Sequence, residues 1–170
     1  SLRVELTKKL GRFPLFRFWG PATDISSSQW IGDATVHVRE TSDPTLTLVY
    51  LPHLDYNLQR LGPHHPDIAT DLREVDGVCG QIIDQAEADD ARIIVLSEYG
   101  ITPVNRPVHL NRVLRQAGLI QVREEEHDKE ILDPGASGAF AVADHHIAHI
   151  YVNDKIRLAE IKSLIEAQPG

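Results

Sequence analysis

The sequence has 170 residues, of which 42% are hydrophobic and 25% are charged, which is ordinary for a globular domain. Its net charge of −8 excludes a general nucleic-acid surface, because such surfaces need clustered lysines and arginines. The absence of an apolar run of about 18 residues excludes a membrane span. The single cysteine, Cys79, excludes an intrachain disulfide, and we expect a cytoplasmic protein.

Two helices separated by an aromatic segment are expected in the first part of the chain. Residues 2–10 have a helix-compatible composition that ends at Gly11, and apolar spacings of three and four predict a second helix through residues 30–38, capped by the serines at 26–28. Residues 12–21 between them hold three of the four phenylalanines and Trp19. They form either a wall that stacks a nucleobase or an aromatic loop buried under a neighbouring segment.

Two short apolar runs, residues 45–51 and 92–96, predict buried strands, and an acidic residue follows each of them: Asp55 and Glu98. Between them, apolar residues from 68 to 86 at alternating spacings of four and three predict a long helix packed on the sheet. Polar groups past the ends of parallel strands share one edge of the sheet. We therefore expect both carboxylates to face one crevice, as in a metal site.

The rest of the chain predicts a loop over 101–107, a helix over 108–118, a short strand over 119–122 and a charged turn over 124–130. Residues 138–152 carry two β-like runs around a polar centre, and a last helix follows the capping residues 153–154. The alternation of helix and strand predicts an α/β three-layer sandwich with a mostly parallel sheet. A small antiparallel element is expected near residues 119–152.

The order of these motifs resembles the type I phosphodiesterase and nucleotide pyrophosphatase branch of the alkaline phosphatase superfamily. In that branch the first motif is usually Asp-x-x-x-His-x-x-Gly-Pro and the second is Ser-Asp-His-Gly, and together they supply ligands to two metals. The sequence keeps five of these residues in register: Asp55, Gly62, Pro63, Ser97 and Gly100.

The departures from the two motifs change the ligand chemistry. Gln59 stands where the family has His, and Glu98 and Tyr99 stand where it has Asp-His. These replacements remove nitrogen donors and leave oxygen, which suits Mg, Mn or Ca better than Zn. The resemblance implies divalent metal ions, Zn, Mn or Mg, and the ligands expected from it are Asp55, Gln59 and Glu98.

Further polar residues are candidates for the same chemistry. Five more residues are candidate metal ligands: His53, His64, Tyr99, Asp144 and His145. The alternatives are a surface role for His64 and a strand-edge histidine cluster around Asp144 and His145, because a continuous strand points neighbours to opposite faces. The segment after the second motif offers three phosphate-binding candidates, with a solvated surface as the alternative: Asn105, Arg106 and His109.

The resemblance implies a metal-dependent hydrolase of phosphodiester or pyrophosphate bonds that acts on a small phosphorylated substrate such as a nucleotide. In the family the attacking group is a Thr or Ser near the start of a longer catalytic domain. We therefore expect residues 1–170 to be a central part of such a domain, without the nucleophile segment and a C-terminal segment, and inactive alone. The alternative is a non-catalytic relative that binds a nucleotide or a protein partner.

Overall fold

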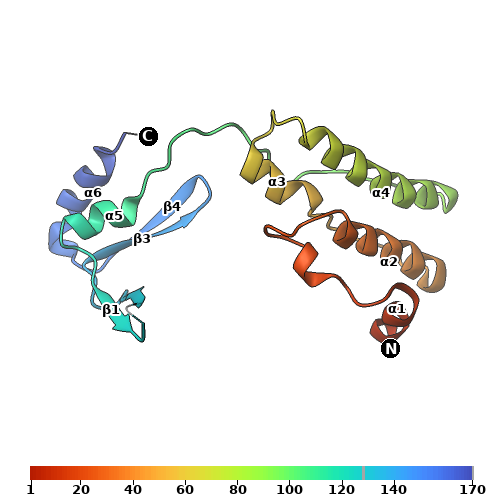
Figure 1. Cartoon of the computed structure of the whole chain (residues 1–170), viewed down its shortest axis with the longest axis horizontal. Coiled ribbons are helices and arrows are strands. Elements are labelled where there is room, and N and C mark those ends of the chain that lie inside the picture. Colours follow the sequence, from red (N-terminus) through yellow and green to blue (C-terminus); the bar gives the residue numbers. More distant parts are fainter. Residues whose placement is uncertain (128, 170) are drawn as a thin grey trace. The chain divides into compact units, whose positions relative to one another are not determined.

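The computed structural model describes residues 1–127 and 129–169, and the chain forms two compact units (Figure 1). The first unit is Ser1–Val104 and the second is Asn105–Gly170. Helices make up the regular structure of the first unit, whereas the second combines helices with antiparallel strand pairs. The predicted α/β class is therefore confirmed. Within the described residues, no helix has the length and apolar character needed to cross a membrane.

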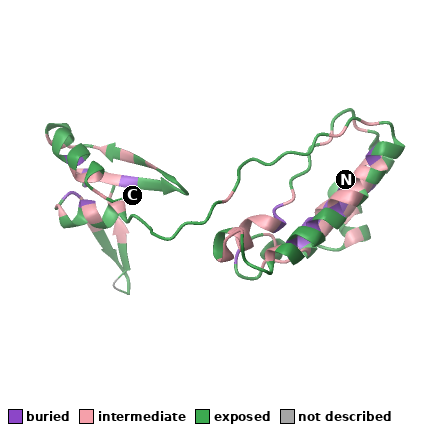
Figure 2. Ribbon diagram, turned by 90° about the horizontal axis from the view of Figure 1, so that it is seen from above, coloured by how far each residue is buried: buried purple, intermediate pink, exposed green. Residues whose placement is uncertain are grey.

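The first unit is built on two long helices that pack against each other. Its elements are α1 (Leu2–Leu10), the short 3-10 helix η1 (Leu15–Arg17), α2 (Ser26–Ser42), α3 (His53–Leu61) and α4 (Ile68–Ala88). Buried residues lie along the two long helices α2 and α4 (Figure 2). Of the apolar stripe predicted on α4, Val75 and Ala86 are buried, whereas Leu72 is 54% exposed. The helices predicted at 2–10, 30–38 and 68–86 are confirmed, although α2 begins at Ser26 and extends to Ser42.

The serines at the start of α2 do not cap it. Ser27 and Ser28 are fully buried inside the helix. The carboxylate of Asp24 lies just before the helix, and its Oδ1 accepts the backbone N–H of Ser26 at 3.0 Å. An acidic side chain at this point satisfies a free amide of the first turn and interacts well with the positive end of the helix dipole.

The two predicted buried strands, 45–51 and 92–96, are not formed in the described structure. Both segments lack regular secondary structure, and their apolar side chains are exposed, for example Leu48 at 87% and Ile94 at 76%. A strand exists only when its backbone pairs with a neighbouring strand, and neither segment belongs to a ladder here. The three-layer sandwich with a parallel sheet is therefore not shown, and α3 is a helix that the sequence analysis did not predict.

The second unit confirms the small antiparallel element. Its elements are α5 (Leu110–Gln116), β1 (Val122–Glu125) paired with β2 (Lys129–Leu132), β3 (Ala139–Asp144) paired with β4 (Ile147–Val152), η2 (Lys155–Arg157) and α6 (Leu158–Glu166). Leu114 of α5 and Ile161 of α6 pack with Ala139 and Ala141 of β3 to form its core. Asp154 caps η2 rather than the last helix: its side chain accepts the backbone N–H of Ile156, whereas α6 begins after Arg157 without a side-chain cap.

The predicted bounds of two elements are wrong: those of the short strand at 119–122 and those of the charged turn at 124–130. Leu119 lies in the core, 2% exposed, and the strand begins at Val122 instead. The charged residues mostly form the β1–β2 hairpin, and the guanidinium of Arg115 donates two hydrogen bonds to the Glu130 carboxylate, at 2.6 and 2.7 Å. This bidentate contact explains why so polar a hairpin stays beside α5.

The packing of α2 on α4 depends on the missing side chain of Gly32. A Cβ at this position would lie 2.6 Å from Cγ1 of Val78, which is 1% exposed and, as a β-branched residue, has little rotamer freedom in a helix. We predict that Gly32→Ala lowers the free energy of unfolding by about 1–3 kcal/mol through overpacking, measured by urea denaturation of the 170-residue chain.

Gly77 on α4 provides the matched control, because a Cβ added there meets no atom within 4 Å. Gly77→Ala should raise the free energy of unfolding by about 0.5–1 kcal/mol, since alanine has the higher helix propensity. The packing argument is wrong if Gly32→Ala stabilises the chain as much as Gly77→Ala does.

Candidate functional site

The carboxylate of Asp55 accepts hydrogen bonds from a side chain of its own helix, α3, and from side chains of two other parts of the first unit. Its Oδ2 accepts from Nε1 of Trp19 at 2.6 Å. Its Oδ1 accepts from Nε2 of Gln59 at 2.8 Å and from the hydroxyl of Tyr99 at 2.5 Å. The aromatic segment, α3 and the second motif therefore meet at one carboxylate.

Local structure explains how each donor reaches Asp55. Gln59 is four residues further along α3, so that both side chains lie on the same face of the helix. Trp19 packs edge to face on Tyr56 of the same helix, with ring centroids 5.1 Å apart. Tyr99 sits in a turn in which the hydroxyl of Ser97 donates to its backbone carbonyl at 2.5 Å. The motif serine thus shapes the turn that presents Tyr99.

The hydrogen bond to Asp55 also changes the acidity of Tyr99. It raises the pKa of the phenol to about 12, with smaller contributions from burial and from the negative charge of Asp55 and Glu98. The phenol therefore stays protonated at neutral pH and acts as a donor. The side chains of Trp19, Gln59 and Tyr99 that donate to Asp55 are uncharged.

The chemistry of these side chains fits a hard divalent cation. A carboxylate, an amide and a phenol within hydrogen-bonding distance offer oxygen atoms, which are the ligands that Mg²⁺ and Mn²⁺ accept. An ion bound by Asp55 would compete with the hydrogen bonds from Gln59 and Tyr99. Both side chains would then turn their oxygen atoms towards the ion.

We expected the carboxylates of Asp55 and Glu98 to face one crevice, but the observed contact between the two motifs joins Asp55 to Tyr99. Gln59 is the predicted ligand that also donates to Asp55. Glu98 is exposed beside Tyr99, and His64 is exposed in the turn after α3. Asp144 and His145 contact each other at 2.6 Å at the tip of the β3–β4 hairpin, with both side chains more than half exposed. Their roles, as metal ligands or as a strand-edge histidine cluster, stay predictions.

The three phosphate-binding candidates belong to the second unit, whereas Asp55 belongs to the first. They are exposed and lie just before α5: Asn105, Arg106 and His109. Their role therefore stays a prediction.

His53, a candidate ligand, contacts two carboxylates that the sequence analysis did not single out. Its Nε2 lies 3.1 Å from Oε2 of Glu74 and 3.9 Å from Oδ1 of Asp71. The two acidic residues are three positions apart in α4, a spacing that places them on one face of a helix. That spacing is a usable signal, but only the structure shows that this face meets His53.

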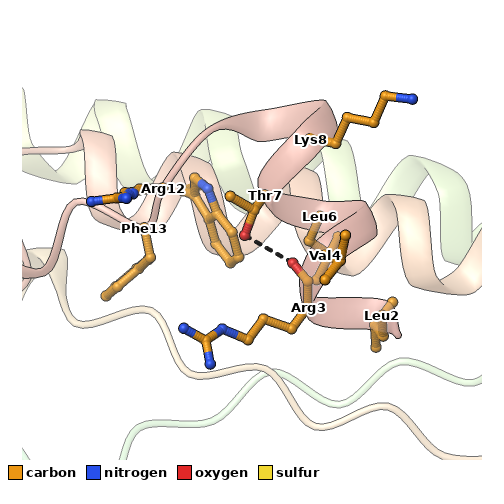
Figure 3. Close-up of a pocket in the computed structure, with 9 residues that line it drawn as sticks. Leu2, Arg3, Val4, Leu6, Thr7, Lys8, Arg12 and Phe13 are labelled. Carbon is orange, nitrogen blue, oxygen red and sulfur yellow. Dashed lines mark hydrogen bonds between the residues drawn. The ribbon is translucent and has the colours of Figure 1, made fainter.

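The aromatic segment at 12–21 is partly a packed loop and partly exposed. Phe13 contacts Phe18 and Trp30 edge to face, while Phe16 is 87% exposed and Trp19 binds Asp55. Phe13 also borders an open groove on α1, shown in Figure 3. The groove is lined by Leu2, Arg3, Val4, Leu6, Thr7, Lys8, Arg12, Phe13 and Trp30. None of the predicted site residues lines this groove.

Comparison with known proteins gives one positive result. The family model described as type I phosphodiesterase / nucleotide pyrophosphatase matches residues 3–169, nearly the whole chain. Neither the curated proteins nor the solved structures include a match. The family match confirms the resemblance that was based on the motifs around Asp55 and Ser97.

We predict that Tyr99 titrates abnormally in the folded chain. Because its folded pKa is raised to about 12, the stabilisation from the protonated phenol is complete below about pH 10 and is lost as the pH rises towards 12. Ultraviolet titration should therefore show a tyrosine that ionises late, and Asp55→Asn should move this titration to lower pH.

Tyr99→Phe serves as the control that assigns the signal, because the late-titrating tyrosine should disappear from its titration curve. An unchanged late phase in Tyr99→Phe would contradict the assignment to the Asp55 contact.

Proposed function

Because the chain belongs to the type I phosphodiesterase / nucleotide pyrophosphatase family, we propose that it is part of a metal-dependent hydrolase of phosphodiester or pyrophosphate bonds. The observation that carries the proposal is the contact between Asp55 of the first motif and Tyr99 of the second, 44 residues apart in the chain. These are the positions at which the resembled family has metal ligands.

Asp55 is the proposed central ligand, with Gln59 and Glu98 completing the set of oxygen donors. A divalent cation bound there would polarise a phosphoryl oxygen and activate an attacking group. Trp19 supports this role, because its hydrogen bond to Oδ2 orients the carboxylate. The proposed substrate is a small phosphorylated molecule such as a nucleotide. Asn105, Arg106 and His109 of the second unit are proposed separately as phosphate-binding residues.

Other expectations also remain proposals. We propose that residues 1–170 are part of an alkaline phosphatase-like catalytic domain and do not hydrolyse a substrate alone, because the Thr or Ser nucleophile of the resembled family has no identified counterpart among them. The exposed apolar segments 45–51 and 92–96 support a three-layer sandwich in which they become strands. Cytoplasmic location likewise stays a prediction.

A second function is favoured by the hydrogen bonds at Asp55. Trp19, Gln59 and Tyr99 supply uncharged donors that satisfy the carboxylate without an ion. A non-catalytic relative would keep this arrangement and bind a nucleotide or a protein partner by other surfaces. The two functions differ in whether a divalent cation is needed.

The experiment compares Asp55→Asn with unaltered protein, in the full-length protein that contains this chain. Hydrolysis of bis(p-nitrophenyl) phosphate and of ATP is followed after chelation and after adding back Mg²⁺, Mn²⁺ or Zn²⁺. We predict metal-dependent hydrolysis and at least a 100-fold lower kcat/KM in Asp55→Asn, which corresponds to about 2.7 kcal/mol of transition-state stabilisation.

Asp43→Asn is the matched control, because Asp43 is exposed at the end of α2 and Asn accepts its left-handed backbone conformation. Its activity should equal that of the unaltered protein. If no metal restores hydrolysis and nucleotide binding is insensitive to chelator, the non-catalytic function replaces the proposed one.

A further inference from the structure

A second group of metal-ligating side chains lies between α3 and α4. None of its residues belongs to either of the two family motifs. His53 is the first residue of α3, and Asp71 and Glu74 lie one turn apart near the start of α4. One nitrogen of His53 and one oxygen of each carboxylate all lie within 4.8 Å of one another. We propose that these three side chains bind a divalent transition-metal ion that joins α3 to α4.

The spacing of the ligand atoms suits such an ion. Metal–ligand bonds of about 2.0–2.2 Å at tetrahedral or octahedral angles place neighbouring ligand atoms about 3.0–3.5 Å apart. Nε2 of His53 already lies 3.1 Å from the Glu74 carboxylate and 3.9 Å from that of Asp71. All three ligand atoms lie within 4.8 Å of one another, so modest side-chain movements would bring them onto one ion.

The charge of the group also favours a cation. Two carboxylates and one imidazole carry a net negative charge whether or not the imidazole is protonated. Among the described residues, neither Asp71 nor Glu74 forms an ion pair with a lysine or an arginine. The nearby Arg73 instead donates to the backbone carbonyl of Ala69 and the hydroxyl of Thr70. A bound dication would compensate the repulsion between the two carboxylates.

Burial distinguishes this group from a surface cluster of acidic residues. His53 is 2% exposed and Asp71 is 9% exposed, so both are held within the packing of α3 against α4. Nδ2 of Asn57 donates to Oδ2 of Asp71 at 2.7 Å, which leaves Oδ1 directed at His53. Outer hydrogen bonds of this kind orient the ligands of metal sites. The side chain of Glu74 is 43% exposed and provides the route from solvent.

This site is separate from the carboxylate of Asp55. Residues two positions apart in an α-helix point about 200° apart around its axis, so His53 and Asp55 lie on opposite faces of α3. The inference goes beyond the proposed function, since binding here requires no hydrolysis and none of the ligands Asp55, Gln59 and Glu98. An ion at this site would fix α3 on α4 and so stabilise the helix that carries Asp55.

The donor set specifies the class of ion. One imidazole nitrogen with two carboxylate oxygens suits Zn²⁺ or Mn²⁺, whereas Mg²⁺ and Ca²⁺ prefer oxygen alone. We therefore choose Zn²⁺ as the probe and Co²⁺ as its spectroscopic substitute, whose visible absorption reports the coordination of the ion.

Zn²⁺ binding is measured by calorimetry on the metal-free 170-residue chain and on Asp71→Asn and Glu74→Gln. We expect one tightly bound equivalent at this site, apart from any weaker binding at the oxygen donors around Asp55, and an affinity for it at least tenfold lower in both variants. Saturating Zn²⁺ should raise the Tm of the unaltered chain by several degrees and leave the Tm of the two variants nearly unchanged.

Two control variants keep the outcome clear. Asp76→Asn changes an exposed carboxylate of α4 outside the group, and Asp55→Asn removes the carboxylate of the proposed catalytic site. Asp76→Asn should bind Zn²⁺ within twofold of the unaltered chain and show the same Co²⁺ spectrum. Asp55→Asn should keep the tight equivalent that is bound by His53, Asp71 and Glu74. Circular dichroism confirms that each variant is folded, and the partly exposed Glu74 makes Glu74→Gln the mildest test.

The proposal is overturned if the unaltered chain binds no Zn²⁺, or if Asp71→Asn and Glu74→Gln bind it as tightly as the unaltered chain. Loss of binding in Asp55→Asn alone would place the ion at the proposed catalytic site instead. If Asp55→Asn still binds Zn²⁺ and the unaltered protein hydrolyses neither test substrate, the metal site at His53 is supported and the proposed function is wrong.

Discussion

The carboxylate of Asp55 connects parts of the first unit that no strand pairing joins. Trp19 precedes it by 36 residues and Tyr99 follows it by 44 residues, yet both donate hydrogen bonds to its two oxygen atoms. The segments that lead to Asp55 and Tyr99, 45–51 and 92–96, form no ladder in the described structure. Side-chain hydrogen bonds, each contributing about 0.5–1.5 kcal/mol, therefore hold the second motif against α3.

The short helix α3 links this contact to the helical core. Asp55 occupies one of its faces, while His53 on the opposite face meets the carboxylates of α4. The α4 helix in turn packs closely on α2 at Gly32, where only a hydrogen atom fits against Val78. A change in the packing of α2 on α4 can therefore be transmitted to the position of Asp55.

The sequence predicted the features that depend on local pattern. The apolar spacing of α4 and the polar centre of the β3–β4 hairpin located these elements, and the two motifs singled out Gln59 and Tyr99 as candidate ligands, both of which donate to Asp55. It failed where the outcome depends on distant partners. The runs 45–51 and 92–96 have the composition of strands but no paired neighbour, and the group around His53 forms only through the packing of α3 on α4.

The central claim is that the two motifs meet at Asp55, and a double-mutant cycle of Asp55→Asn and Tyr99→Phe tests it most directly. The free energy of unfolding is measured by urea denaturation for the unaltered chain, both single variants and the double variant. The partly exposed contact should give a coupling energy of about 0.5–1 kcal/mol. Additive effects, with a coupling energy near zero, would contradict the claim that this hydrogen bond joins the motifs.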